Sequence, residues 1–285
     1  MAAKKLKASE RSTLIGKLTT ALKKRYGGKV PEPATQRGVL ETLVFGALLE
    51  DNVDESAESG YVQLNDGFHD LNEIRVSSIR EIEAVISDLP QADWRSLRIK
   101  DALQHVFELN YTYDLDSLRK KNQEQASGEL GEVPRITPFM KLYTLQAGLG
   151  NHVMPVDHHQ LALLRWLGLS DSEATEEQAA DELKSAVRKA DGSLFSYLFR
   201  QAANAPGVLA VTLDAMNATD EFDPKSRMSE LDGLLDGKKP AAKKAAKSTK
   251  AAAKSPKKAA KKAAKSPKKT VKKAARKTKK AAAKK

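Results

Sequence analysis

The C-terminal segment of residues 238–285 is the feature that most constrains how this chain can fold. It is composed of Lys, Ala, Ser, Thr and Pro with a single Arg and a single Val, so it lacks the large apolar side chains from which a core is built. Such a segment cannot offset the conformational entropy that it would lose on folding. We therefore expect residues 238–285 to form a disordered tail, and the folded part of the chain to precede them.

The tail also divides the charge of the chain. Of the 49 Lys and Arg residues, 22 lie in residues 238–285, which contain no Asp or Glu. The other 27 stand against 37 acidic residues in residues 1–237, so that part has a net charge of −10 although the whole chain carries +12. Lysine ammonium groups neutralise phosphates and release counterions without reading the bases. The sequence therefore predicts a polycation that binds nucleic acid, joined to an acidic folded domain.

Most basic residues of the tail are predicted nucleic-acid contacts. The motif Lys-Ser-Pro-Lys-Lys occurs at residues 254–258 and again at 265–269. The tail resembles the C-terminal tails of histone H1 and the Lys/Ala-rich tails of some bacterial nucleoid proteins, which implies DNA as the partner; charge alone does not distinguish DNA from RNA. A merely solubilising tail is the competing interpretation. The predicted contacts are Lys238, Lys239, Lys243, Lys244, Lys254, Lys257, Lys258, Lys261, Lys262, Lys265, Lys268, Lys269, Lys272, Lys273, Arg276 and Lys277.

The composition excludes several classes of site. The chain has no Cys, which excludes disulfides, thiolate metal sites and cysteine-bound iron–sulfur clusters. No apolar run approaches the length of a membrane span, and residues 1–6 lack the apolar stretch of a signal peptide. We expect an intracellular, DNA-associated protein of the bacterial nucleoid and cytoplasm or of the nucleus, with no cofactor, metal or membrane partner.

Apolar residues before the tail recur at helical spacing, and no sustained alternation of period two interrupts them. The clearest predicted helices cover residues 9–26, begin at Val39, cover 97–109, and begin after Asp157 and Thr175. The chain is therefore predicted to be all-α, with roughly eight to ten helices. The expected divisions are an N-terminal helix (1–30), a helical domain (31–220), a linker (221–237) and the tail (238–285).

Two groups of residues in the folded part could take part in chemistry or binding. Trp94, Arg95, Arg98 and Lys100 cluster around a predicted helix start and form a candidate DNA-facing patch, with Lys100 as its predicted contact. The competing interpretation is a core Trp with solvated basic neighbours. Asp157 precedes a predicted helix, so it can cap that helix or serve as a base. The histidines around it have no metal-site spacing, so we expect no metal there.

The order of motifs resembles one known family. Residues 145–150 read Leu-Gln-Ala-Gly-Leu-Gly and lead to residues 156–159, which read Val-Asp-His-His. Residues 43–49 form an apolar segment, residues 99–102 read Ile-Lys-Asp-Ala, and residues 167–169 read Leu-Gly-Leu. These segments resemble motifs of the endonuclease III family of helix-hairpin-helix DNA glycosylases. Residues 145–150 and 156–159 resemble its G-rich turn and the V-D-T-H that follows, and residues 43–49 resemble its second helix. Residues 99–102 resemble its "K-A" helix start, and residues 167–169 resemble its R-L-G-L segment.

The resemblance implies two helical subdomains that flank a DNA cleft. It also implies that Asp157 corresponds to the catalytic aspartate. In that family the carboxylate activates the nucleophile and stabilises the oxocarbenium-like transition state while the flipped base departs.

The chain departs from the family pattern at several positions. The family hairpin reads L-P-G-V-G-x-K-T-A, whereas residues 133–140 read Val-Pro-Arg-Ile-Thr-Pro-Phe-Met, without either glycine. Phe139 takes the position of the lyase lysine, and Lys141 lies two residues on, about 200° around a helix. Lyase chemistry through a Schiff base is therefore not expected. Residues 50–52, at the position of the wedge that fills the hole left by a flipped base, are Glu-Asp-Asn and suit contact with DNA poorly.

Three functions stay open on these grounds. The first is a DNA-binding protein of the endonuclease III type that acts as a monofunctional DNA N-glycosylase in base-excision repair through Asp157, without lyase activity. The second is a chromatin- or nucleoid-associated binder with the same fold and no catalysis. The third is a domain that binds a protein partner and is localised to DNA by its tail.

Overall fold

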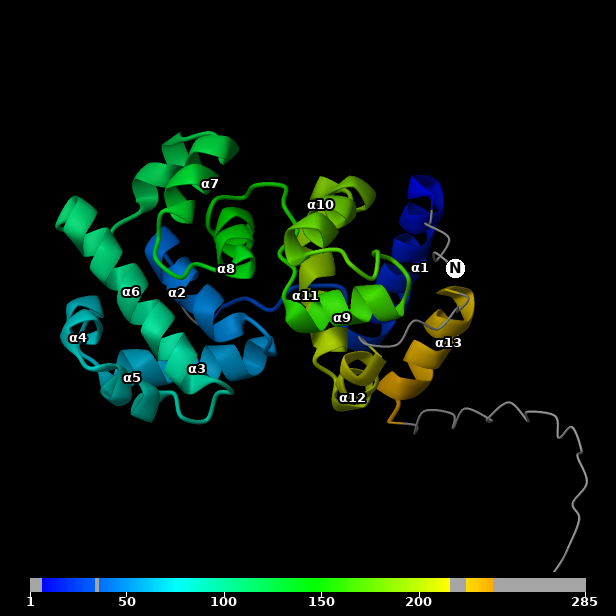
Figure 1. The fold of residues 1–285 in the computed structure, drawn as a ribbon, viewed down its shortest axis with the longest axis horizontal. Coiled ribbons are helices and arrows are strands. Elements are labelled where there is room, and N and C mark those ends of the chain that lie inside the picture. The colour runs from blue at the N-terminus through cyan, green and yellow to red at the C-terminus, as the bar shows by residue number, and fades with distance from the viewer. Residues whose placement is uncertain (1–6, 34–35, 216–223, 238–285) are drawn as a thin grey trace, which may run out of the picture. The chain divides into compact units, whose positions relative to one another are not determined.

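The computed structural model describes residues 7–33, 36–215 and 224–237, and the predictions for the tail lie outside these residues. The described chain is all-α, with thirteen α-helices and no strand, which confirms the predicted fold class (Figure 1). No helix within these ranges is long and apolar enough to cross a membrane.

The helices form two subdomains, each around its own cluster of buried apolar side chains. Because α1 belongs to the second subdomain, the chain passes from the second to the first and back again. The first subdomain contains α2 (Val39–Leu49), α3 (Asp54–Gly67), α4 (Leu71–Val76), α5 (Ile79–Val85), α6 (Ala92–Asn110), the short helix η1 (Asp116–Lys120), α7 (Gln123–Gly131), α8 (Pro138–Tyr143) and the π-helical turn η2 (Thr144–Gly148). The second contains α1 (Ala8–Tyr26), α9 (His158–Trp166), α10 (Glu176–Ala186), η3 (Lys189–Asp191), α11 (Gly192–Ala203), α12 (Pro206–Ala215) and α13 (Pro224–Leu235).

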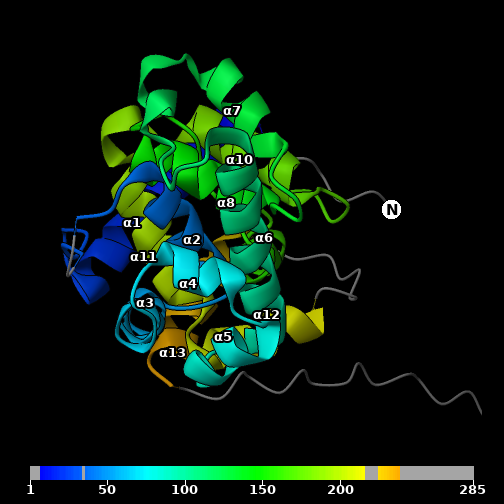
Figure 2. The same cartoon turned by 90° about the vertical axis from the view of Figure 1, so that its left-hand side faces the viewer.

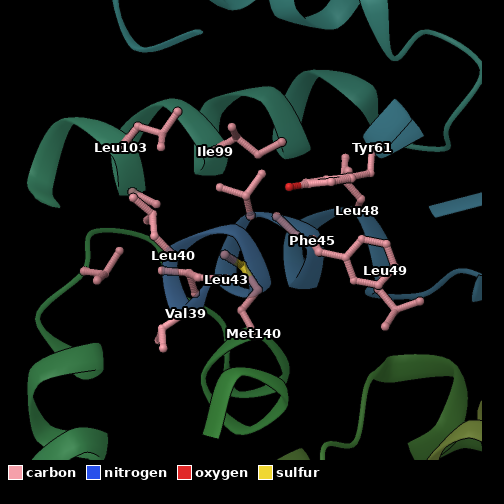
Figure 3. Packing of buried hydrophobic residues seen from close by; sticks show 14 of the residues in the cluster. Val39, Leu40, Leu43, Phe45, Leu48, Leu49, Tyr61, Ile99, Leu103 and Met140 are labelled. Atoms are coloured by element: carbon pink, nitrogen blue, oxygen red, sulfur yellow. The ribbon is translucent and has the colours of Figure 1, made fainter. Parts of the chain in front are cut away.

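Helix α2 forms the centre of the first subdomain. Its sequence is apolar on every face, and ten of its eleven residues are buried. Such a helix must be enclosed on all sides, and α3, α6 and α8 pack around it (Figure 3). Helix α8 packs next to Gly46, where a Cβ atom would lie in ordinary van der Waals contact, 3.5 Å from the Cα of Met140 and 3.4 Å from Cδ1 of Tyr143. The helices α4 and α5 pack against α6 (Figure 2).

The second subdomain is built on α11, the most amphipathic of its helices. Helix α1 packs on α11 through a stripe of apolar residues, Leu14, Ile15, Leu18 and Leu22, as its predicted helical spacing requires. Residues 224–235, which lie within the linker predicted at 221–237, form α13. Its Leu231 and Leu234 are buried in the same cluster, and α13 packs on α12. The described chain thus continues the second subdomain through α13.

Three other stretches differ from the sequence-based expectation. Residues 54–67, for which the sequence predicts no helix, form α3 because Ala57, Tyr61 and Leu64 make a buried face. Helix α6 begins at Ala92 and not at Leu97. Residues 99–102 therefore lie about two turns inside α6, so the segment that resembles the "K-A" motif is not a helix start.

Candidate functional site

Asp157 is the N-cap of α9, which confirms the capping role predicted for it. Its Oδ1 accepts a hydrogen bond from the backbone N–H of Gln160 at 2.8 Å, and Oε1 of Gln160 accepts one from the backbone N–H of Asp157 at 3.1 Å. This reciprocal pair is a capping box. The side chain of Asp157 has 0% exposure, so it serves the helix from within the protein.

A loop of the first subdomain covers the other carboxyl oxygen. The backbone N–H of Asp51 donates to Oδ2 of Asp157 at 3.3 Å. In return, Oδ1 of Asp51 accepts the backbone N–H of His159 at 3.2 Å, in the first turn of α9. Asp51 adopts a left-handed conformation, with φ of 52°. Both oxygens of Asp157 thus accept backbone hydrogen bonds, one from its own helix and one from the loop after α2.

The environment of Asp157 favours its neutral form. Burial, and next the negative charge of Asp51, raise the pKa of Asp157 to about 8, although the hydrogen bonds from Gln160 and Asp51 and the guanidinium of Arg200 act in the opposite direction. Near neutral pH the group is therefore mainly a carboxylic acid, and a carboxylic acid has no proton-accepting anion to offer a water molecule.

A polar cluster joins the loop after α2 to the second subdomain. Arg200 of α11 is 3% exposed and binds both oxygens of Asp54, through Nη2 at 2.7 Å and Nε at 3.0 Å. Nδ2 of Asn204 donates to the backbone oxygen of Asn52 at 3.2 Å, and Oδ1 of Asn204 lies 2.7 Å from Nδ1 of His159. These contacts hold residues 51–54 against α9 and α11.

A cavity of about 250 Å³ lies beside this loop. Its lining comes from the loop after α2, the start of α6, the start of α8 and the start of α10, and Asp157 is not part of it. The lining residues are Glu50, Asp51, Gln91, Arg95, Arg98, Thr137, Pro138 and Glu176. Three of them are carboxylates and two are guanidiniums.

The two arginines of the cavity are already engaged. Arg95 donates to the backbone oxygens of Pro90 and Ala47, both at 2.6 Å, and of Glu50 at 2.7 Å. Arg98 forms an ion pair with Glu50 at 2.5 Å. Burial, and next the carboxylates of Glu50 and Asp51, raise the pKa of Glu176 to about 7. The three carboxyl groups of the cavity wall therefore lie close enough together to oppose one another's ionisation.

The structure separates the residues of the patch predicted around Trp94. Trp94 is 52% exposed, whereas Arg95 is buried under the loop and Arg98 neutralises Glu50. The ammonium of Lys100 donates to the backbone oxygens of Arg75 and Ser77, both at 2.6 Å, at the end of α4. A DNA contact through Lys100 stays a prediction, and it would have to use the third ammonium proton.

The turn between α7 and α8 occupies the position of the family hairpin. Arg135 takes a positive φ of 56° there and forms an ion pair with Asp101. Thr137 caps α8, and Pro138, its first residue, has no N–H to offer a phosphate. Phe139, at the position of the lyase lysine, is fully buried and stacks on Tyr143 at 5.9 Å.

Lys141 lies away from the cavity beside Asp51. Its ammonium is 3.5 Å from Glu177, and the side chain lines a different hollow between α7, α8 and α10. Two of the histidines near Asp157 have backbone or amide partners: Nε2 of His152 lies 3.2 Å from the backbone oxygen of Lys184, and Nδ1 of His159 lies 2.7 Å from Oδ1 of Asn204. Within the described residues, no group of His, Asp and Glu has the arrangement of a metal site.

Sequence reasoning missed Asp51 and Arg200 as members of this site. In the sequence Asp51 stands out only as part of the acidic segment 50–52, and no motif includes Arg200. No local signal marks either, because each acquires its partner through the packing of the two subdomains.

Comparisons with known proteins place the fold. No protein-family model matches the chain, and no curated protein matches it. Solved structures of several DNA glycosylases do match the chain. A non-covalent endonuclease III–DNA complex superposes with a TM-score of 0.54 at 14% identity, over 76% of this chain and 98% of that chain. A thermostable thymine-DNA glycosylase gives 0.51 at 14% identity, over 69% and 86%.

A third structure agrees with these two. The Clostridium acetobutylicum 8-oxoguanine glycosylase/lyase in complex with double-stranded DNA gives a TM-score of 0.51 at 12% identity, over 69% of this chain and 70% of that chain. The two helical subdomains are thus those of the helix-hairpin-helix DNA glycosylase fold, as the resemblance of the motifs predicted.

Proposed function

We propose that this protein is a DNA-associated binder whose glycosylase-type domain does not excise bases, and that its basic tail supplies most of its affinity for DNA. The observation that carries the proposal is the enclosure of Asp157. Its carboxyl group is 0% exposed, and both of its oxygens accept backbone N–H groups.

Hydrolysis of a glycosidic bond needs a fixed negative charge near the sugar and a water molecule beside it. A buried carboxylic acid without contact to the cavity supplies neither. A lyase would need an amine in the cavity, but the lining contains no lysine, and the family's lysine position holds the buried Phe139. Hydrolysis thus lacks its carboxylate, and the lyase reaction lacks its amine.

The charge of the folded part supports the proposal that the tail, and not the folded domain, supplies most of the affinity for DNA. Residues 1–237 carry a net charge of −10, and the cavity wall includes Glu50, Asp51 and Glu176. Duplex DNA presents one phosphate about every 1.7 Å of its axis, so an acidic surface meets repulsion unless a local basic patch intervenes. Attraction must then come mainly from the 22 basic residues of the tail.

An excision assay tests this proposal. The full-length protein is incubated with duplexes that carry deaminated, oxidised or alkylated bases, and abasic sites are revealed by alkali. We expect no excision above the background of the Asp157→Asn variant. Excision by the wild type that disappears in Asp157→Asn would overturn the proposal and establish a hydrolytic glycosylase.

One observation favours that hydrolytic glycosylase as the second candidate. Asp51, which covers Asp157, also lines the cavity, so the aspartate lies behind a residue of the cavity wall. An excision-competent form would require this residue to move.

A further inference from the structure

The loop after α2 holds Asp51 in a conformation that non-glycine residues seldom adopt. Its φ of 52° lies in the left-handed region, where the backbone of a residue with a Cβ atom is strained. Surrounding contacts must therefore hold it there. The two that involve Asp51 itself both lead to the start of α9: its N–H to Oδ2 of Asp157, and its carboxylate to the N–H of His159.

The second of these contacts puts a negative charge at a helix N-terminus. The first N–H groups of a helix lack partners within the helix and favour an anion. In α9 the cap Asp157 satisfies Gln160, and Asp51 satisfies His159. The side chain of Asp51 therefore takes the position that an external anion or water would otherwise take, and it does so from another subdomain.

We propose that Asp51 is a built-in plug, which fills the path between the cavity and Asp157 and keeps that aspartate out of contact with water. The inference rests on the proposed function, since it names the residue that keeps the domain from excising bases. Among the residues that the structure describes, Asp51 is the one that both lines the cavity and bonds to Asp157.

Contacts to both subdomains hold the plug in place. On the first subdomain, Nη2 of Arg95 binds the backbone oxygen of Glu50, the residue before the plug. On the second, Asn204 binds the backbone oxygen of Asn52, the residue after it, and Arg200 binds Asp54. The loop cannot withdraw from Asp157 without breaking contacts to one subdomain or the other, so the closed form is the resting form.

Charged groups face Asp157 from three elements. Asp51 opposes its ionisation from the loop, whereas Arg200 of α11 and Arg95 of α6 interact with it favourably when it is charged. Removal of the Asp51 carboxylate takes away the anion that opposes ionisation of Asp157 and leaves these two cations in place. The aspartate should then ionise more readily.

The test uses two variants of the full chain. Asp51→Gly suits the positive φ and removes the side chain, whereas Asp51→Asn keeps the shape and removes only the charge. Each is treated with a water-soluble carbodiimide and glycine ethyl ester, and modification of Asp157 is read by mass spectrometry. We expect Asp157 to react about tenfold faster or more in Asp51→Gly, and within about twofold of the wild type in Asp51→Asn.

Folding of each variant is checked by circular dichroism. Protection of Asp157 in a folded Asp51→Gly protein would overturn the plug. Should Asp51→Gly fail to fold, the 13C-carboxyl titration of Asp157 in Asp51→Asn decides instead: a lowered pKa supports the pairing, and an unchanged pKa refutes it. Labelling does not depend on excision, so failure of the proposed function and failure of the plug give different results.

Discussion

The backbone N–H of Asp51 lies 3.3 Å from Oδ2 of Asp157 and so connects the end of α2 to the beginning of α9, across the two subdomains. In this fold the motif around Asp157 resembles the catalytic segment of the endonuclease III family, yet here the same residue is part of an internal joint. This contact between the subdomains explains why Asp157 is not exposed to the cavity, although Asp51 lines the cavity and bonds to Asp157.

The first prediction concerns the pH dependence of stability. The folded-state pKa of Asp157 is raised above its ordinary value, to about 8, so between roughly pH 4 and 8 the folded protein holds a proton that the unfolded chain releases. Stability should therefore fall as pH rises through this window, by up to about 1.4 kcal/mol per pH unit from this group. Asp157→Asn removes that contribution.

Urea unfolding of both proteins at pH 5, 6, 7 and 8 measures the effect. The quantity of interest is the difference between the two, because the raised pKa of Glu176 contributes equally to each. We expect the wild type to lose stability relative to Asp157→Asn as pH rises. A difference that stays constant with pH would show that Asp157 is ionised in the folded protein.

The second prediction concerns the ion pair between Arg200 and Asp54. Arg200 is almost fully buried, and its removal leaves the carboxylate of Asp54 without its bidentate partner. Breaking one side of such a buried pair destabilises a protein by about 3–5 kcal/mol. Arg200→Met should lower the unfolding free energy by this order, as measured by urea unfolding at pH 7.

A surface pair provides the matched control for that variant. Arg188 pairs with Asp191 but is 85% exposed, and pairs of this kind contribute about 1 kcal/mol or less. Arg188→Met should therefore change stability little. Equal losses in the two variants would mean that burial does not set the strength of the Arg200 pair.

Helices could be predicted from the sequence where an apolar stripe and a cap coincide. Thr175 and Asp157 are N-caps in the structure, and Val39–Leu49 is helical as its apolar run indicates. Helix α3 could not be predicted because polar residues and Gly60 interrupt the apolar pattern of its buried face. A Cβ atom at Gly60 would lie 2.7 Å from Cδ1 of Leu89, so a larger residue there would require the Leu89 side chain to shift.

The site could be predicted only in part, for a related reason. Capping is local, so the role of Asp157 at α9 follows from residues 157–160 alone. Its second partner lies 106 residues earlier, and the partner of Arg200 lies 146 residues earlier. Such pairs depend on how the subdomains pack, which no spacing in a single sequence records.

The third prediction concerns Arg95, which binds three backbone oxygens at the end of α2 and before α6. Lysine keeps the charge but cannot reach three acceptors in a fixed planar arrangement. Because buried acceptors left without donors cost about 1–3 kcal/mol, Arg95→Lys should destabilise the protein by about 2 kcal/mol in urea unfolding. Arg80→Lys, at an exposed position on α5, should have almost no effect. Similar changes in both variants would contradict the anchoring role.

The last prediction concerns the tail and the salt dependence of DNA binding. If the tail engages about eight phosphates, the logarithm of the binding constant should fall with the logarithm of salt concentration at a slope near −7. A variant whose tail lysines are replaced by glutamine keeps the length of the chain and leaves both apolar clusters untouched, since these end at Leu235. Its slope should approach zero, and its affinity for an undamaged duplex at low salt should fall by about a hundredfold or more. Lys100→Gln serves as the comparison within the folded domain, where the ammonium already binds two backbone oxygens, and it should change the slope by less than about one. A glutamine-tail variant that retained the steep slope would place the phosphate contacts on the folded domain, contrary to the charge of residues 1–237.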